Sequence, residues 1–329
     1  MATKPEVQSL QGAEFLNYWN IMLYADPGAG KTVFAGQDNK ILFLAPEGDG
    51  LKSAQTMKSN ADYVSVKSWE DVKNAYEWYD EHPEELADFN VFVIDSISEL
   101  QFLAKDYTLR MTADEKRRKN QDPTKMQIQD YGIMHELLEM MVRGFNDLQI
   151  NVLYTATAKM VADADENNFL VPDLQGKKEY GIALKMAALM TAYGYLRVEV
   201  VDVPAPTEDD PKAIKPVKRR VIYWEDTGTI RGKDRTNALK PFTVNATLQQ
   251  VRLAIAGKLI RNNDGKLVKP DAAAPVKAAP TRPPVKKVQA SPQPTNKVES
   301  VPQQDHSVAE NAAARADANM EVTLDAVEA

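Results

Sequence analysis

The sequence contains no cysteine, which excludes disulfide bonds and thiolate metal sites. Its only histidines are His82, His135 and His306, and their scatter does not indicate a metal site. No apolar run is long enough to span a bilayer, and the first residues lack the apolar core of a signal peptide. These absences favour a protein without membrane segments, for which we expect a cytoplasmic location.

The composition changes late in the chain. Of 329 residues, 43% are hydrophobic and 26% charged, which suits one main globular domain. The last aromatic residue is Phe242, and from about Asn263 the sequence is rich in Ala, Pro, Lys and Gln. Such a segment buries too little apolar surface to offset its ordering entropy. We therefore expect an N-terminal extension over 1–16, a globular domain over 17–262 and a disordered tail over 263–329.

The tail is basic first and acidic at its end, although the whole chain carries a net charge of -7. It either solvates the domain, or its acidic end competes with nucleic acid for a basic surface or docks a partner protein. Composition alone does not decide between these alternatives.

The most specific motif spans residues 25–32, which read Ala-Asp-Pro-Gly-Ala-Gly-Lys-Thr between an apolar strand and a helix-compatible segment. This is the layout of a phosphate-binding loop, whose glycines let backbone N–H groups close around phosphate oxygens. Lys31 can reach the outer phosphates, and the Thr32 hydroxyl can bind Mg²⁺. Ala25 departs from the usual first glycine but is its smallest replacement. The predicted nucleotide-binding residues here are Asp26, Pro27, Gly28, Ala29, Gly30, Lys31, Thr32 and Val33.

A second motif is the apolar strand over 91–94, which ends in Asp95. A carboxylate at the end of a strand beside the phosphate loop can hold Mg²⁺ through its waters. The alternative is an aspartate that caps the next helix, which Ser96 or Ser98 could do equally well. With the loop upstream, the sequence favours ATP and Mg²⁺ as cofactors, with Thr32 and Asp95 as the metal ligands.

The general base for the attacking water is not the residue after Asp95, because that residue is Ser96. Glu47 follows the apolar strand over 40–45, which is the first strand after the phosphate loop. An acid there faces the crevice at the carboxyl edge of a parallel sheet. We therefore predict Glu47 as the general base, with Glu99 as the second candidate. The alternative for Glu47 is an ordinary turn acid.

Apolar strands alternate with helical patterns along the globular part, which predicts an α/β fold with a mostly parallel sheet and right-handed crossovers. Residues 202–220 are expected to form a long hairpin loop. The predicted strands are 18–25, 40–45, 61–66, 90–95, 150–157, 192–201 and 218–225. One helix is predicted to begin at residue 31, and the others span 51–59, 69–79, 99–110, 127–147, 178–190 and 247–259.

The segments 44–48 and 93–97 are similar to those of the RecA/RadA superfamily of P-loop ATPases. Over roughly 17–258 the chain more closely resembles the phage-encoded RecA-like ATPases of the Sak group, which are implicated in single-strand annealing and homologous recombination. The narrower resemblance depends on Asp95-Ser96, on 172–177 and on 233–236 (Lys-Asp-Arg-Thr). It implies a RecA-like core and a protein of the phage-infected bacterial cytoplasm.

The resemblance also implies roles for later segments. Loops over about 111–126 and 159–181 would line a DNA path, and basic loops bind phosphates with an affinity that falls with salt; a solvated surface is the alternative. The polar strand end Thr155-Ala156-Thr157 lies where the family places a residue that senses the γ-phosphate, with Thr157 as the predicted contact. Lys233 and Arg235 would reach the ATP of a neighbouring subunit, unless they only form a surface turn. The predicted nucleic-acid contacts are Lys116, Arg117, Arg118, Lys119, Lys125, Lys177 and Lys178.

The leading functional hypothesis is an ATP-dependent recombination protein that binds single-stranded DNA and forms a homo-oligomeric ring or filament. It would hydrolyse ATP to ADP and phosphate at subunit interfaces, with stimulation by DNA. Its tail could recruit a single-strand-binding or replication protein. The alternatives are a RecA-fold replication helicase or loader, and a nucleotide-gated binding module with little hydrolysis.

Overall fold

The computed structural model describes residues 18–46, 48–118, 122–163, 165–175, 181–205 and 214–270. All of them belong to the first of two units into which the chain divides, Met1–Ala273. The predicted extension over 1–16 and the tail from 271 onward lie outside the described residues, as does the second unit, Ala274–Ala329.

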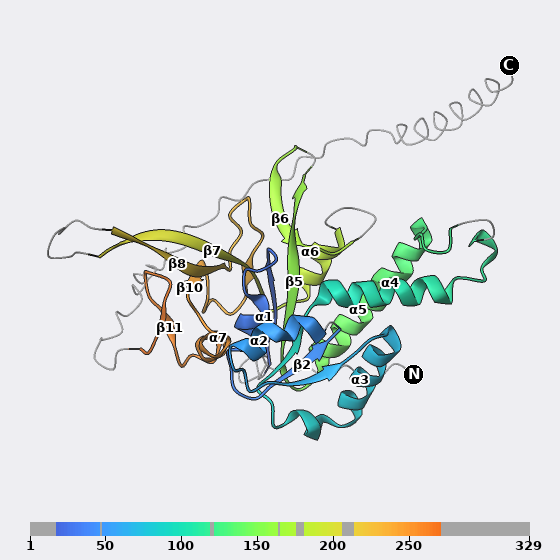
Figure 1. The fold of residues 1–329 in the computed structure, drawn as a ribbon, viewed down its shortest axis with the longest axis horizontal. Coiled ribbons are helices and arrows are strands. Elements are labelled where there is room, and N and C mark those ends of the chain that lie inside the picture. Colours follow the sequence, from blue (N-terminus) through green and yellow to red (C-terminus); the bar gives the residue numbers. More distant parts are fainter. Residues whose placement is uncertain are drawn as a thin grey trace, which may run out of the picture. The chain divides into compact units, whose positions relative to one another are not determined.

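The centre of the sheet is parallel, with strands in the order β3-β2-β4-β5-β1-β7 (Figure 1). Strands β1, β2 and β4 are almost continuous apolar runs that are buried on both faces, as expected for parallel strands covered by helices. The bounds of the parallel strands are β1 Asn20–Ala25, β2 Ile41–Ala45, β3 Asp62–Ser65, β4 Val91–Ile94, β5 Asn151–Ala162 and β7 Ala192–Pro204.

Helices cover both faces of the sheet because successive strand side chains point to opposite sides. Met22 and Tyr24 of β1 pack with α3, α4, α5 and α6, whereas Ile21 and Leu23 pack with α1 and α7. The helices are α1 Lys31–Ala35, α2 Lys52–Thr56, α3 Trp69–Glu81, α4 Ile97–Met111, α5 Ile128–Asp147, α6 Gly181–Ala188 and α7 Leu248–Ile255, with short 3-10 turns η1 Gly48–Leu51, η2 Pro83–Leu86 and η3 Lys116–Arg118.

This arrangement confirms the predicted fold class, a RecA-like P-loop core with a mostly parallel sheet flanked by helices. Within the described ranges, no helix combines the length and apolar character needed to cross a membrane.

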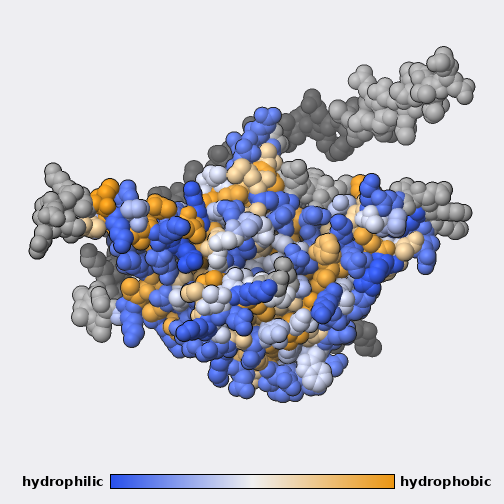
Figure 2. All heavy atoms as spheres, viewed as in Figure 1, coloured by the Kyte–Doolittle hydropathy of each residue, from blue (hydrophilic) through white to orange (hydrophobic). Residues whose placement is uncertain are grey.

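Antiparallel strands extend the sheet beyond β7 and β5. They are β6 Asn168–Pro172, β8 Ile214–Tyr223, β9 Lys233–Asp234 and β10 Phe242–Val244. Much of the predicted loop over 202–220 is instead paired strand, because 202–204 of β7 lie opposite 214–216 of β8. The β-branched run from Val198 to Val203 favours the extended conformation. Apolar and hydrophilic side chains alternate over this β7–β8 ribbon (Figure 2).

The domain also continues past the predicted boundary at residue 262. Strands β11 Ile260–Arg261 and β12 Leu267–Val268 form a small hairpin. Leu267 is buried in the core on the α1 side, and the backbone N–H of Val244 donates to the carbonyl of Gly265 over 2.8 Å. The buried Leu267 and this backbone bond tie the segment to the domain, although its composition lacks aromatic residues.

Candidate functional site

The loop after β1 has the backbone of a phosphate-binding loop. Gly28 and Gly30 have φ values of 79° and 101°, in the left-handed region that favours glycine. Helix α1 begins directly after Gly30, at Lys31. Ala25, which replaces the usual first glycine, is fully buried in the core, and Val33 is half-buried in α1. The predicted loop therefore lies where the motif requires it, at the carboxyl edge of the sheet.

Two side chains shape the start of this loop. The Lys31 ammonium donates to the carbonyls of Ala25 and Asp26 over 3.1 and 3.3 Å, so it lies over the loop rather than in solvent. Burial lowers the pKa of Lys31, while Asp95 and Asp26 act in the opposite direction. The hydroxyl of Tyr195 on β7 donates to Asp26 over 2.9 Å, and burial followed by this carboxylate raises the pKa of Tyr195 to about 12. The neighbouring Pro27 and Gly28 are exposed to solvent.

Asp95 lies at the centre of a cluster that the sequence reveals only in part. The Thr32 hydroxyl donates to Asp95 Oδ2 over 2.6 Å, and the Thr155 hydroxyl donates to Asp95 Oδ1. The sequence predicts that the strand before Asp95 lies beside the phosphate loop. In the structure this strand, β4, is not next to β1, because β5 lies between them. This intervening strand carries Thr155, which is fully buried. The contact of Thr155 with Asp95 was missed, because only the strand order places the two side chains together.

The oxygen atoms of this cluster fit a magnesium ion. Among the described residues, no group of three or more histidine, aspartate or glutamate side chains could hold a metal on its own. Thr32 and Asp95 would therefore supply only part of the ligand set, with phosphate oxygens and water completing it, as Mg²⁺ prefers. When bound, the ion would stabilise negative charge on the phosphates.

The serines after Asp95 have other tasks. Ser96 is the N-cap residue of α4, and its Oγ accepts a hydrogen bond from the backbone N–H of Glu99 over 3.3 Å; the Asp95–Ser96 peptide bond is cis. Ser98 Oγ donates to the carbonyl of Asp173 over 3.0 Å and accepts from the N–H of Thr157 over 3.4 Å. Because Ser96 caps the helix, the Asp95 carboxylate is left to bind the two hydroxyls.

Thr157 lies opposite Ala25 in the pairing of β5 with β1, at the point where the phosphate loop begins. It lies two residues after Thr155, so both side chains point to the same face of the sheet. Its position is compatible with the predicted contact with phosphate, which stays a prediction.

Of the two candidate bases, Glu47 lies outside the described residues. The strand before it, β2, ends at Ala45, and the backbone N–H of Asp95 donates to the carbonyl of Leu44 over 3.3 Å. The end of β2 therefore lies beside the Asp95 backbone, as the prediction for Glu47 requires. Glu99 is half-buried in the first turn of α4.

Comparison with known families decides the broad identity. A family model described as an AAA domain matches residues 17–236. The chain belongs to this AAA domain family. None of the curated proteins matches it. Among solved structures, the crystal structure of a KaiC-like protein from the hyperthermophilic archaeon Pyrococcus horikoshii OT3 is similar, at 13% identity and a TM-score of 0.29 over 62% of this chain and 77% of that chain. So low a score carries no argument, and the fold assignment depends on the sheet order and the loop. The AAA domain is thus a P-loop NTPase by family and by loop geometry.

Lys233 and Arg235 lie near the start of β7, at the amino edge of the sheet of the AAA domain, whereas the phosphate loop lies at the carboxyl edge. The Lys233 ammonium donates to the carbonyls of Ala187 and Ala188 over 2.9 and 3.2 Å, and Arg235 Nη2 donates to Ala188 over 3.2 Å. Both cations therefore satisfy carbonyls at the end of α6. Burial, and then Arg235, lower the pKa of Lys233 to about 8. The structure gives both residues a role within their own chain, and contact with a neighbour's ATP stays a prediction.

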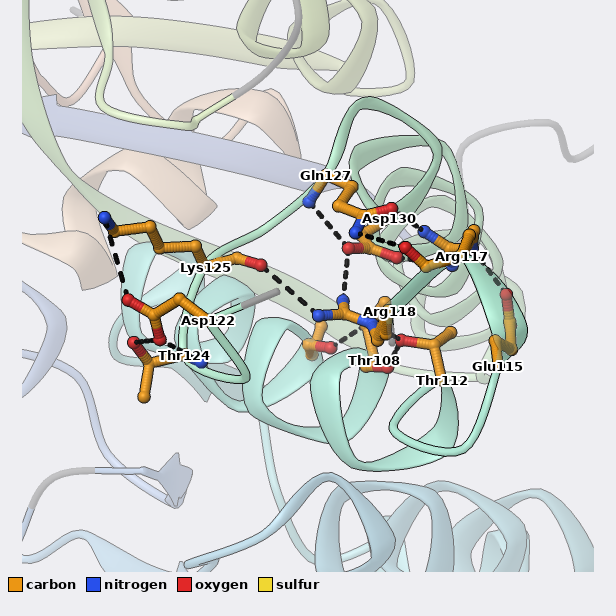
Figure 3. A network of polar contacts seen from close by, with 11 residues as sticks. Thr108, Thr112, Glu115, Arg117, Arg118, Asp122, Thr124, Lys125, Gln127 and Asp130 are labelled. Atoms are coloured by element: carbon orange, nitrogen blue, oxygen red, sulfur yellow. Dashed lines mark hydrogen bonds and ion pairs between the residues drawn. The ribbon is translucent and has the colours of Figure 1, made fainter. Parts of the chain in front are cut away.

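The first basic loop of the AAA domain is folded around an acid. Arg117 Nη2 donates to Asp130 Oδ1 over 2.6 Å, and Arg118 donates to the other carboxylate oxygen (Figure 3). The Arg118 side chain is only 4% exposed and that of Asp130 is 0% exposed. Burial acts to raise the pKa of Asp130, but the N–H of Gln127 and the two guanidinium groups lower it overall.

This triad corrects the prediction of DNA contacts from Arg118, because a buried guanidinium bound to a carboxylate cannot reach a phosphate backbone. Arg117 is largely occupied too, since it also binds Glu115. Lys125 is 81% exposed and remains a candidate, with Asp122 at 3.6 Å. Phe169, which lies in the second predicted DNA loop over 159–181, is buried in the core. The side chain of Lys116 and all of Lys119, Lys177 and Lys178 lie outside the described residues.

Replacing Thr155 with valine tests the cluster around Asp95. The substitution keeps the side-chain shape but removes the hydroxyl, so Asp95 Oδ1 loses a buried donor. We expect a rise of about tenfold in the Mg²⁺ concentration that half-activates ATP hydrolysis. Thr56→Val is the matched control, because the Thr56 hydroxyl binds only a backbone carbonyl in exposed α2. An unchanged Mg²⁺ dependence in Thr155→Val would remove Thr155 from the site.

Proposed function

We propose that this protein is an ATPase that binds single-stranded DNA and acts in recombination, by annealing or strand pairing. The observation that carries the ATPase part is the convergence of Thr32, Asp95 and Thr155 at the edge of the phosphate loop. Three elements, α1, β4 and β5, meet there, which is the arrangement needed to hold a triphosphate and its metal ion together.

Different groups of this chain would bind the phosphates and take the proton from the attacking water during hydrolysis. The backbone N–H groups of the loop and the Lys31 ammonium would hold the phosphates and stabilise charge as the terminal phosphoryl bond breaks. The proposed base, Glu47, would take a proton from the attacking water. The β2 terminus that precedes Glu47 is fixed to β4 by the backbone bond between Asp95 and Leu44, so both acids would face the same crevice.

The single-stranded DNA part follows the resemblance to the Sak group, and one set of contacts supports its coupling to ATP. The segment 173–175, which leads to Lys177 and Lys178, is bound to the start of α4 just after Asp95. Ser98 donates to Asp173, and the Gln101 side chain exchanges bonds of 2.9 and 2.6 Å with the backbone of Gln175. A change at Asp95 can therefore reach the second proposed DNA loop through the first turns of one helix.

The proposal extends to assembly and setting. A homo-oligomeric ring or filament would place ATP at subunit interfaces, where Lys233 and Arg235 of one subunit would have to leave the carbonyls of α6 to reach the nucleotide of the next. The tail after residue 270 would recruit a single-strand-binding or replication protein. The cell would be a phage-infected bacterium.

The deciding experiment is steady-state ATP hydrolysis by the wild type with and without a single-stranded oligonucleotide, repeated for Glu47→Gln. We expect DNA to stimulate the wild type, and Glu47→Gln to lose about a hundredfold or more of that activity. Glu84→Gln, an exposed acid in η2, is the control for the loss of one charge.

Each other result excludes the proposal. Hydrolysis that ignores DNA would point to a different role for the P-loop. ATP binding without hydrolysis would favour the nucleotide-gated binding module, and ATP-driven duplex unwinding would favour the helicase.

A further inference from the structure

Arg220 of β8 lies against the phosphate loop, although it is almost two hundred residues away in the sequence. Its Nε lies 3.4 Å from the carbonyl oxygen of Ala29. A Cβ atom placed on Gly30 would stand only 3.1 Å from Arg220 Nε and 3.3 Å from Nη2. The guanidinium group thus lies in direct contact with the last glycine before Lys31.

The backbone of Arg220 is held from both sides. Its pairing partner on β7 is Val198. On the other side, the N–H of Arg220 donates to Asn245 Oδ1 over 2.8 Å, and the N–H of Asn245 donates to the Arg220 carbonyl over 2.7 Å. The side chain is therefore projected onto the loop from a fixed strand rather than from a mobile connection, as a preorganised ligand would be.

Arg220 also differs from most described arginines in its partners. Those that pair with a carboxylate are Arg110, Arg117, Arg118, Arg143, Arg219, Arg231 and Arg252. In the part of the chain that the structure describes, no acid pairs with Arg220, and the one hydrogen bond of its side chain is the long one to Ala29. A guanidinium group has five N–H donors, so most of those on Arg220 are available to an anion.

We propose that Arg220 is a phosphate ligand for the nucleotide held by the loop of its own subunit. An unpaired guanidinium that touches the loop at Gly30 supplies the planar set of donors that suits phosphate oxygens. This inference rests on the proposed ATPase function, because it assumes that the loop binds ATP. It adds a cation from β8 to the one supplied by Lys31.

The test is the dissociation constant of a fluorescent ATP analogue with Mg²⁺, measured for the wild type, Arg220→Ala and Arg220→Lys. Lys218→Ala is the matched control, since Lys218 is an exposed cation two residues earlier on the same strand, whereas the side chain nearest to Gly30 is that of Arg220. We expect Arg220→Ala to bind on the order of tenfold more weakly, Arg220→Lys to lie between it and the wild type, and Lys218→Ala to match the wild type. The melting temperature without nucleotide should be unchanged, because the Arg220 side chain is exposed and makes only one long hydrogen bond.

Two results would overturn the assignment while the ATPase function stands. In the first, Arg220→Ala binds the analogue within twofold of the wild type. In the second, both variants bind equally weakly and both melt earlier without nucleotide, which would make Arg220 a structural brace. If the wild type itself does not bind the analogue, the proposed function fails and this inference fails with it.

Discussion

Replacing Asp95 with asparagine is expected to lower ATP hydrolysis by at least about a hundredfold at saturating Mg²⁺. Both oxygens of the carboxylate accept hydroxyl donors, one from Thr32 and one from Thr155. An amide can accept only one of these bonds and turns an NH₂ group toward the other hydroxyl. It also removes the negative charge that would face the metal ion. Steady-state release of phosphate over a Mg²⁺ titration measures the loss.

The control for Asp95→Asn is Asp106→Asn, which makes the same change of charge on the exposed side of α4. That variant should hydrolyse ATP like the wild type. Asp95→Asn should still bind nucleotide, since the loop and Lys31 remain intact. If Asp95→Asn kept more than about a tenth of the wild-type rate, the Thr32–Asp95–Thr155 cluster would not be the catalytic metal site.

Replacing Asp130 with alanine is expected to destabilise the fold by about 3–5 kcal/mol. The carboxylate is fully buried and accepts hydrogen bonds from Arg117, from Arg118 and from the backbone N–H of Gln127, the last over 2.7 Å. Its removal leaves the buried Arg118 guanidinium without a counter-charge. The measurement is the free energy of unfolding from urea titrations at neutral pH.

The pH dependence gives this prediction a second check. Because the folded-state pKa of Asp130 is lowered, its stabilising effect is complete above the unfolded value of about 3.9 and is lost as the pH falls through the lower folded value. The difference between the wild type and Asp130→Ala should therefore shrink in acid. Asp106→Ala, which breaks an exposed pair with Arg110, should lower the free energy of unfolding by only a small fraction of the loss in Asp130→Ala. If Asp130→Ala left the free energy of unfolding almost unchanged, the two arginines would not depend on this carboxylate and would again be candidates for binding DNA.

The local parts of the site could be predicted from the sequence, because each is encoded in one stretch of chain. The run from β1 through the loop into α1 carries its own glycines and apolar pattern, and β4 is an apolar run that ends at Asp95. The position of Thr155 could not be predicted, because nothing in β5 records that this strand inserts between β1 and β4. Arg220 is missed for the same reason, since its neighbour Gly30 is far away in the sequence.

The basic loop shows the opposite error. Arg117 and Arg118 look like a surface cluster when only their neighbours in sequence are considered. Asp130 lies twelve residues after Arg118, in the first turn of the following helix, and the packing of α4 against α5 buries both. The spacing of charges along a chain does not report such a pairing, because it depends on the angle at which two helices meet.

Strand β5 links the Asp95 cluster mechanically to the β5–β6 pair, which lies beyond the phosphate loop. It touches Asp95 at Thr155 and then continues for seven residues, to Ala162, where β6 is its hydrogen-bonded partner from Ala158 onward. At about 3.3 Å per residue, this outer part extends roughly 23 Å from the Asp95 carboxylate. An extended strand hardly stretches along its axis, so a displacement at Asp95 would be passed along β5 toward its pairing with β6. If ATP is hydrolysed at this site, β5 is the element that would transmit the change at the phosphates to that distant surface.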